Sequence, residues 1–191
     1  MILFRNATPA DQPSRERTVA DVCFGHVYAI RPTQALLKRL GVRITGTEEV
    51  AATTVLGEWF VRPHNVGHQR LLLCTSSRSL LTILIPGRDL PGVGDRLRMA
   101  VGELLFALGA PIDQINRELE EMRHYAFRPS NDRSVIGSMT DMARLADGYL
   151  EDGSSSDHLV VVGMKLARAP FAPLNYDSPR RVALALLCST A

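Results

Sequence analysis

Residues 130–141 are richer in small and polar side chains than packing requires, in the order Ser-Asn-Asp-Arg-Ser-Val-Ile-Gly-Ser-Met-Thr-Asp. They join an expected strand to an expected helix, which Asn131 or Asp132 can cap by accepting a hydrogen bond from a first-turn N–H. Open N–H groups beside Arg133 would favour an anion such as a phosphate. Asp132 and Asp141 would repel that anion, so we rank close packing of the chain against this helix above a ligand site.

The expected helix has two different faces. At about 100° per residue, one face is apolar and should meet the core: Val135, Met139, Met142, Ala146 and Tyr149. The other face carries small or polar residues: Ser134, Gly137, Ser138, Asp141 and Gly148. Because an interior glycine costs about 1 kcal/mol relative to alanine, these small residues indicate a close neighbour. That neighbour is another part of this chain, a second subunit or a ligand.

A basic hairpin is the second group of side chains with chemical potential. Its basic members are Arg62, His64, His68, Arg70 and Arg78. Trp59 and Phe60 could stack on bases there, which gives weak support to a nucleic acid as a ligand. The competing interpretation makes Trp59 a core anchor and the arginines solubilising groups. The formal charge of +2 is too small to predict nucleic-acid binding by itself.

Motifs of known reactions and metal sites are absent from the sequence. It contains no H-E-x-x-H, no Cys/His cluster, no G-x-S-x-G and no phosphate-binding loop, so we predict no metal and no cofactor. His64 and His68 are expected across a hairpin turn. Glu118, Glu120 and Glu121 are expected on the solvated side of an amphipathic helix.

Composition points to one globular domain. The chain has 191 residues, of which 46% are hydrophobic and 22% charged, values ordinary for a folded domain. We divide it into a polar N-terminal arm, 1–22, and a single domain, 23–191. No apolar run is long enough for a bilayer or a signal peptide, which predicts no membrane partner. Three widely spaced cysteines favour reduced thiols in the cytoplasm.

The pattern of elements predicts an α+β fold with an antiparallel sheet of about four or five strands and helices largely on one face. Strands are expected at 26–30, 57–63, 69–75, 80–85 and 124–128, with a weak one within 42–56. The apolar run 80–85 predicts a central strand covered on both faces. Helices are expected at 32–40, with Pro32 at its first position, at 95–108, 111–122 and 180–187, and after residue 130. Residues 157–168 fit a helix through Leu159, Val162 and Leu166 and a strand through the run 160–162, and we favour the helix.

The 130–141 stretch resembles a bacterial family of domains of unknown function, number 6933, whose members carry close to T-N-N-R-S-V-L-G-S-M-N-D here. The matching residues are Asn131, Arg133, Ser134, Val135, Gly137, Ser138, Met139 and Asp141. The resemblance covers about residues 28–187 and includes Trp59, Arg70, Thr75, Pro86, Gly87, Pro170 and Tyr176. It departs where members have W-x-A-N, at Trp59 to Arg62, and an Asn, at Ala167. It implies a fold and a pocket without an activity.

These observations predict a non-enzymatic cytoplasmic binding or interaction protein. Its candidate binding residues are Asn131, Arg133, Ser134, Ser138, Asp141, Trp59, Arg62 and Arg70. The partner would be a protein or, with weaker support, a nucleic acid, and the small-residue face would also suit a homo-oligomer. The alternative is an enzyme for a phosphate-bearing or nucleic-acid substrate, in which Arg133 clamps the anion and Asp141 or His124 transfers a proton.

Overall fold

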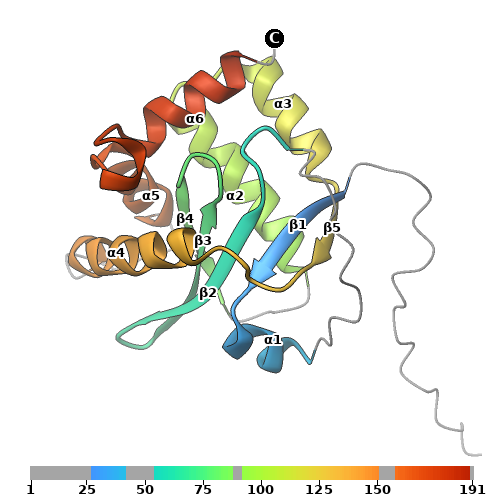
Figure 1. Ribbon diagram of the computed structural model, residues 1–191, viewed down its shortest axis with the longest axis vertical. Coiled ribbons are helices and arrows are strands. Elements are labelled where there is room, and N and C mark those ends of the chain that lie inside the picture. Colours follow the sequence, from blue (N-terminus) through green and yellow to red (C-terminus); the bar gives the residue numbers. More distant parts are fainter. Residues whose placement is uncertain (1–26, 42–53, 88–91, 151–157, 190–191) are drawn as a thin grey trace, which may run out of the picture.

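The computed structural model describes residues 27–41, 54–87, 92–150 and 158–189. The expected N-terminal arm and most of the segment expected to hold a weak strand lie outside these residues. The described parts form an α+β fold around one sheet (Figure 1). None of the described helices is both long and apolar enough to cross a bilayer.

The sheet has five strands in the order β4-β3-β2-β1-β5. They are β1 (Val27–Pro32), β2 (Trp59–Val66), β3 (Gln69–Ser76), β4 (Thr82–Pro86) and β5 (His124–Phe127). The predicted hairpins are confirmed, because β2, β3 and β4 pair antiparallel. The purely antiparallel sheet is wrong, because β1 runs parallel to both β2 and β5. Parallel neighbours need long crossovers, and long connections do separate these strands in the chain.

The strand predicted to be central, β4, lies at the edge of the sheet. Its apolar run is nevertheless buried, with Ile83, Leu84 and Ile85 each no more than 4% exposed. The cover comes from α2 (Val93–Ala107) and α5 (His158–Arg168), which both contact β4. The continuous apolar run therefore predicted correctly that β4 is buried and incorrectly that it lies at the centre of the sheet.

Helices cover both faces of the sheet, which corrects the expectation of one covered face. Alternate residues such as Val61, Leu72 and Ile85 join α2, α3 (Ile112–Glu121) and α6 (Pro179–Cys188) in one core. Phe60, Leu73 and Leu84 point the other way, into a second core with α4 (Arg133–Leu150) and α5. In Figure 1, the start of α4 lies in front of β3, whereas α2 lies behind the strands.

Helix ends follow the sequence signals with one exception. Gly41 ends α1 (Gln34–Leu40) in the left-handed conformation with φ +63°. Pro32 does not open this helix: it ends β1, and Thr33 precedes the first turn. The expected helix at 157–168 is confirmed as α5, and a short 3-10 turn, η2 (Ala172–Leu174), precedes α6.

Candidate functional site

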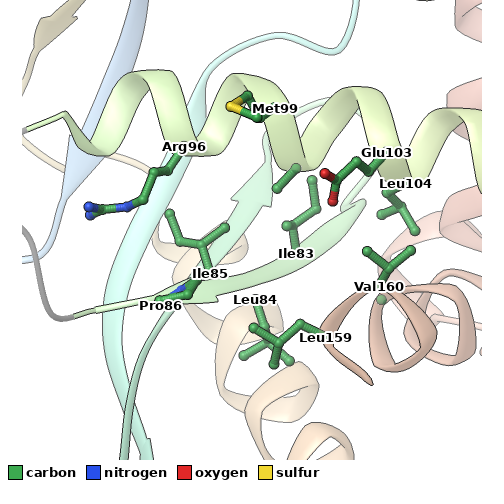
Figure 2. A pocket seen from close by; sticks show the side chains of 12 residues that line it. Ile83, Leu84, Ile85, Pro86, Arg96, Met99, Glu103, Leu104, Leu159 and Val160 are labelled. Atoms are coloured by element: carbon green, nitrogen blue, oxygen red, sulfur yellow. The ribbon is translucent and has the colours of Figure 1, made fainter. Parts of the chain in front are cut away.

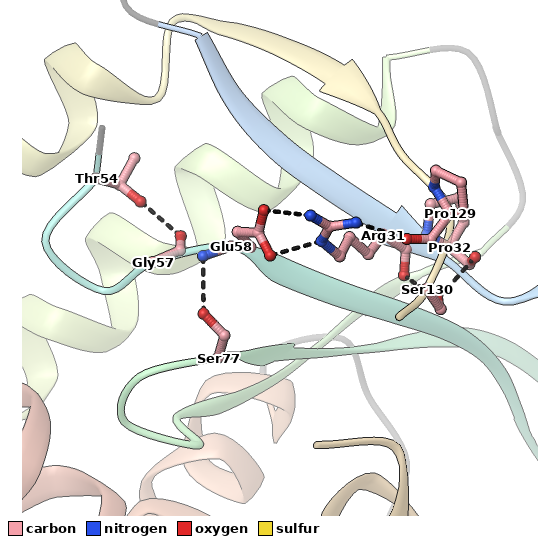
Figure 3. Close-up of polar contacts among 8 residues, drawn as sticks. All are labelled: Arg31, Pro32, Thr54, Gly57, Glu58, Ser77, Pro129 and Ser130. Carbon is pink, nitrogen blue, oxygen red and sulfur yellow. Dashed lines mark hydrogen bonds and ion pairs between the residues drawn. The ribbon is translucent and has the colours of Figure 1, made fainter. Parts of the chain in front are cut away.

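A largely buried ion pair lies beneath the turn between β5 and α4, with Glu58 partly exposed. Arg31, at the end of β1, is 7% exposed. Its Nε donates to Glu58 Oε2 at 2.5 Å and its Nη2 donates to Glu58 Oε1 at 2.6 Å. Its Nη1 donates to the carbonyl oxygen of Pro129 at 2.6 Å (Figure 3). One guanidinium therefore joins the segment before β2 to the segment after β5.

Further hydrogen bonds fix both segments. The Ser130 hydroxyl lies 3.0 Å from the carbonyl oxygens of Arg31 and Pro32, which ties the turn to the end of β1. On the other side, Glu58 N–H donates to Ser77 Oγ at 3.0 Å (Figure 3). Ser77 N–H donates in return to the Glu58 carbonyl at 2.8 Å. The carboxylate and the turn that its partner holds are both anchored to the sheet.

Gly57 permits the close approach of these segments. Its φ of +83° lies in the left-handed region, and a Cβ there would lie 2.5 Å from Ser77 Oγ and 2.7 Å from Arg78 Cγ. Any larger residue would strain the backbone and displace the serine that Glu58 uses. Glu58 is thus positioned by Gly57, its neighbour in sequence, and by Ser77 in the β3–β4 turn.

Asp132 caps α4, one of the two caps that the sequence allowed. Its Oδ1 accepts from Ser134 N–H at 2.8 Å and Val135 N–H at 3.1 Å, and its carbonyl accepts from Ile136 N–H at 3.2 Å. The helix start therefore presents a carboxylate, which occupies the N–H groups of Ser134 and Val135. Those two groups are not open to an anion.

An open depression lies above the ion pair and beside the cap. It is lined by Glu58, Phe60, Ser77, Asn131, Asp132, Arg133 and Ser134. The structure thus brings together Asn131, Arg133 and Ser134 from the sequence-based set. Sequence analysis did not find Glu58, Ser77 or Arg31. An arginine inside the apolar β1 and a glutamate before the core residue Trp59 were the signals available.

The small-residue face of α4 is mostly turned outward. Ser134, Gly137, Asp141 and Gly148 are exposed, and a Cβ at either glycine would meet nothing within 4 Å. The expectation that this chain packs closely on that face is therefore wrong at these four positions. Ser138 is 4% exposed, and its hydroxyl donates to the Ser134 carbonyl at 3.0 Å.

The predicted apolar face of the same helix is buried, except for Tyr149, which is partly exposed. The Lys165 ammonium lies 5.1 Å from the centre of the Tyr149 ring, an arrangement that favours a cation over an aromatic face. The core-facing prediction is confirmed for the other four residues.

The basic hairpin does not form one basic surface. Arg62 lies on the α4 side, where its Nη1 donates to Thr140 Oγ1 at 3.3 Å. Arg70 pairs with Asn65 and lies on the opposite side of the hairpin, by the alternation of strand side chains. Trp59 is fully buried in the core, and Phe60 is 1% exposed, so neither ring offers a stacking surface.

His64 is buried against α4. Its Nε2 lies 3.1 Å from Asp147 Oδ1. Burial, the largest influence, lowers the pKa of His64, while the Asp147 carboxylate opposes that shift. His64 and Asp147 therefore hold β2 and α4 together. His64 and His68 do not form a paired metal site, because His64 faces Asp147 whereas His68 is exposed on the hairpin.

Glu118 is buried, which corrects its predicted place on a solvated face. It is 1% exposed, and its carboxylate accepts from Val55 N–H at 2.7 Å and Leu56 N–H at 3.1 Å. Burial raises the pKa of Glu118, and the two backbone hydrogen bonds partly counter that shift. This carboxylate thus caps unpaired backbone groups in the segment before β2.

Thiols and metal ligands are sparse in the described residues. Cys74 is buried and Cys188 is exposed, and both are free. Burial raises the pKa of the Cys74 thiol, which keeps it protonated. Within residues 27–41, 54–87, 92–150 and 158–189, no three His, Cys, Asp or Glu side chains are grouped to hold a metal ion.

The fold and the site define a mixed-sheet α+β domain in which side chains of Arg31 and Ser130 hold the turn between β5 and α4. Residues 29–182 match the family described as Domain of unknown function (DUF6933), so the chain belongs to that family. The match includes the whole of the turn and of α4. No curated protein and no solved structure matches the chain.

Proposed function

We propose that this chain is a non-enzymatic binding protein that recognises a protein partner through the β5–α4 turn and the outer face of α4. The observation that carries this proposal is the use of a buried ion pair, Arg31 with Glu58, to hold a turn that is itself exposed. Asn131 and Arg133 follow directly after the held segment. Their side chains start from a fixed backbone at the edge of an open depression.

Energetics favours a positional role for the pair. A buried ion pair is weak evidence for stability, because replacing both partners by apolar residues is often neutral or stabilising by about 1–4 kcal/mol. A core of two apolar clusters already supports this sheet. Fixing a binding turn before the partner arrives lowers the ordering cost of association. Arg31 and Glu58 supply that rigidity.

The chemistry of the surface suits a folded protein partner. The turn offers an amide, a guanidinium and a hydroxyl, from Asn131, Arg133 and Ser134. The helix beyond offers open space above Gly137, where a partner backbone can approach closely. Charges of both signs, such as Arg144 and Asp141 at 3.6 Å, match a mixed polar surface better than a polyanion. A second copy of this chain is one such partner.

The catalytic alternative has less geometric support. Asp141 lies eight residues beyond Arg133, about 12 Å along the helix, and faces Arg144. His124 opens β5, at the other end of that strand from the turn. A proton-transfer group and an anion clamp would have to meet near one substrate atom.

We place the protein in the cytoplasm, on the free thiols and the cysteine spacing.

Site-specific photocrosslinking tests the proposal. A photoreactive amino acid replaces Ser134 or Gly137 in the full-length chain, expressed in its own cells, and Arg181 on α6 serves as the matched exposed position. We expect the same adduct from both α4 positions and none from α6. Adding Arg133→Glu should abolish the adduct, whereas Arg181→Glu should leave it. Absence of an adduct at α4, or adducts that ignore Arg133, would overturn the proposal.

A further inference from the structure

An apolar groove runs along the outer edge of β4, away from the turn described above. Its floor is the strand, one wall is α2, with Met99 and Ala100, and the other is α5, with Leu159 and Val160 (Figure 2). Ile83 and Ile85 belong to one core and Leu84 to the other. Because residues from both faces of the strand line it, the groove opens onto the strand's edge.

The edge of β4 offers backbone hydrogen-bonding groups to this groove. Ser76 N–H donates to the Leu81 carbonyl at 3.0 Å, and Gly87 N–H donates to the Arg70 carbonyl at 2.8 Å. Pairing with β3 thus uses residues 81 and 87, and by alternation also 83 and 85. The N–H and C=O of Leu84 point outward, and they bond to nothing in the part of the chain described. An added strand would satisfy both groups.

Two features limit the length of that added strand. At one end, α5 approaches closely: a Cβ on Gly163 would lie 3.3 Å from Leu104 Cδ1 and 3.6 Å from the Thr82 carbonyl oxygen. At the other end, Pro86 has no N–H to donate, so pairing stops there. Only a few residues of a ligand can pair with β4.

The positively charged side chain of Arg96 lies near Pro86, where backbone pairing along β4 stops. Arg96 lines the groove near Pro86, with Glu103 farther along the same helix (Figure 2). The Nε and Nη2 atoms of Arg96 are shielded from solvent and have no hydrogen-bond partner among the described residues. A shielded guanidinium nitrogen without a partner is unfavourable, so turning the Arg96 side chain toward the groove to meet a carboxylate would remove an energetic cost. Glu103 lies seven residues on, about 10 Å along the axis.

The size of the groove distinguishes a peptide from a cofactor. Its volume is about 210 Å³, below the roughly 300–1,000 Å³ of sites that enclose a small molecule. Such a space holds one or two apolar side chains while the ligand's backbone lies along the strand. Met99, at 64% exposed, is an adaptable cover for such side chains.

We propose that this groove binds the carboxy-terminal end of a partner polypeptide as a short strand parallel to β4. The terminal carboxylate pairs with Arg96, the Leu84 N–H and C=O bond the peptide backbone, and apolar side chains enter the groove. A bound peptide that ends beside Pro86 uses all of the β4 edge that is open to pairing, because Pro86 has no N–H to donate. The preceding residues leave past Glu103, which favours a basic side chain there.

Binding of defined peptides to the full-length protein tests this proposal. The probe is an N-terminally fluorescent pool of hexapeptides with Lys at the third position and Val, Ile or Leu at the last and third-last positions. Each pool is made as the free acid and as the C-terminal amide. Loss of a charge-assisted hydrogen bond should weaken the amide by about tenfold or more. Arg96→Met should reduce the free acid to the level of the amide, and Arg144→Met on α4 should have no effect.

Two further measurements separate binding at this groove from other outcomes. On addition of the free acid, hydrogen exchange of the Leu84 amide should slow, while the Ile83 and Ile85 amides, already bonded to β3, serve as internal references. Ala100→Phe fills the groove and should abolish binding in a protein with unchanged thermal unfolding. Equal binding of acid and amide, an unaltered Leu84 amide, or displacement of the peptide by sodium decanoate at equal concentration would overturn the proposal.

Discussion

Breaking the Arg31–Glu58 pair on one side should cost far more stability than breaking an exposed pair. Glu58→Gln removes the carboxylate that accepts two guanidinium hydrogen bonds and leaves Arg31, 7% exposed, with a buried charge. Removing one partner of a fully buried pair costs about 3–5 kcal/mol. The Glu58 side chain is 18% exposed, so we expect the lower end, about 3 kcal/mol.

The exposed pair Arg123–Glu120 provides the matched control. Its side chains are 59% and 56% exposed, and pairs of that kind contribute about 0–1 kcal/mol. Urea unfolding followed by far-UV circular dichroism should give a much lower midpoint for Glu58→Gln than for Glu120→Gln, with similar slopes. Equal midpoints for the two variants would refute the reasoning.

Replacing both partners separates stability from position. Arg31→Met with Glu58→Leu leaves no buried charge, and its stability should lie within about 1–2 kcal/mol of the wild type. The Pro129 carbonyl then loses its guanidinium donor, so the turn should loosen. Crosslinking from Ser134 should fall in this folded variant. An undiminished adduct would show that the ion pair does not serve binding.

Three other predictions concern groups whose roles the structure fixes. Asp132→Ala should lower the unfolding free energy by about 1 kcal/mol through loss of the helix cap, and Asn131→Ala should not; equal effects in urea unfolding would contradict the assignment. The pKa of Glu118 is raised in the folded state, so protonation of this carboxyl favours folding. Relative to Glu118→Gln, the wild type should therefore gain stability as the pH falls through the raised folded pKa towards the unfolded value near 4.5. The gain is at most about 1.4 kcal/mol per pH unit. Unfolding midpoints that differ by the same amount at every pH would refute this. Gly137→Leu should leave stability nearly unchanged, because nothing lies within 4 Å of a Cβ there. If the wild type sediments as a species larger than the monomer and this variant sediments as a monomer, a second copy of the chain is the partner of this face. An unchanged sedimentation coefficient in the variant would exclude a second copy as that partner.

Local structure was predictable because local signals determine it. The antiparallel pairs β2–β3 and β3–β4 follow from strands separated by short turns, and Gly41 and Asp132 fulfil end signals that need only neighbouring residues. The parallel pairing of β1 with β2 and β5 depends on long crossovers, which leave no periodic signal. The edge position of β4 was hidden for a related reason, since helices bury an edge strand as fully as a central one.

The candidate site was predicted only in part, because its residues meet across long separations. Asn131, Arg133 and Ser134 adjoin one another in sequence and stood out together. Arg31 and Glu58 are 27 positions apart, and Arg31 lies 98 positions from Pro129. The small residues on the outward face of α4 were expected to pack against this chain, because small residues commonly mark close packing. That rule does not distinguish a neighbour in the same chain from one in another molecule.

Shielded charged groups give a firmer physical argument about this fold than the exposed small residues of α4 do. Arg31, Arg96 and Glu118 each have shielded polar atoms, and the energetic cost of such atoms demands a partner. Arg31 has Glu58 and the Pro129 carbonyl, and Glu118 has the Val55 and Leu56 N–H groups. The described residues supply no equivalent for the Nε and Nη2 of Arg96. We propose that a ligand's carboxylate meets for Arg96 the requirement that the chain itself meets for Arg31 and Glu118.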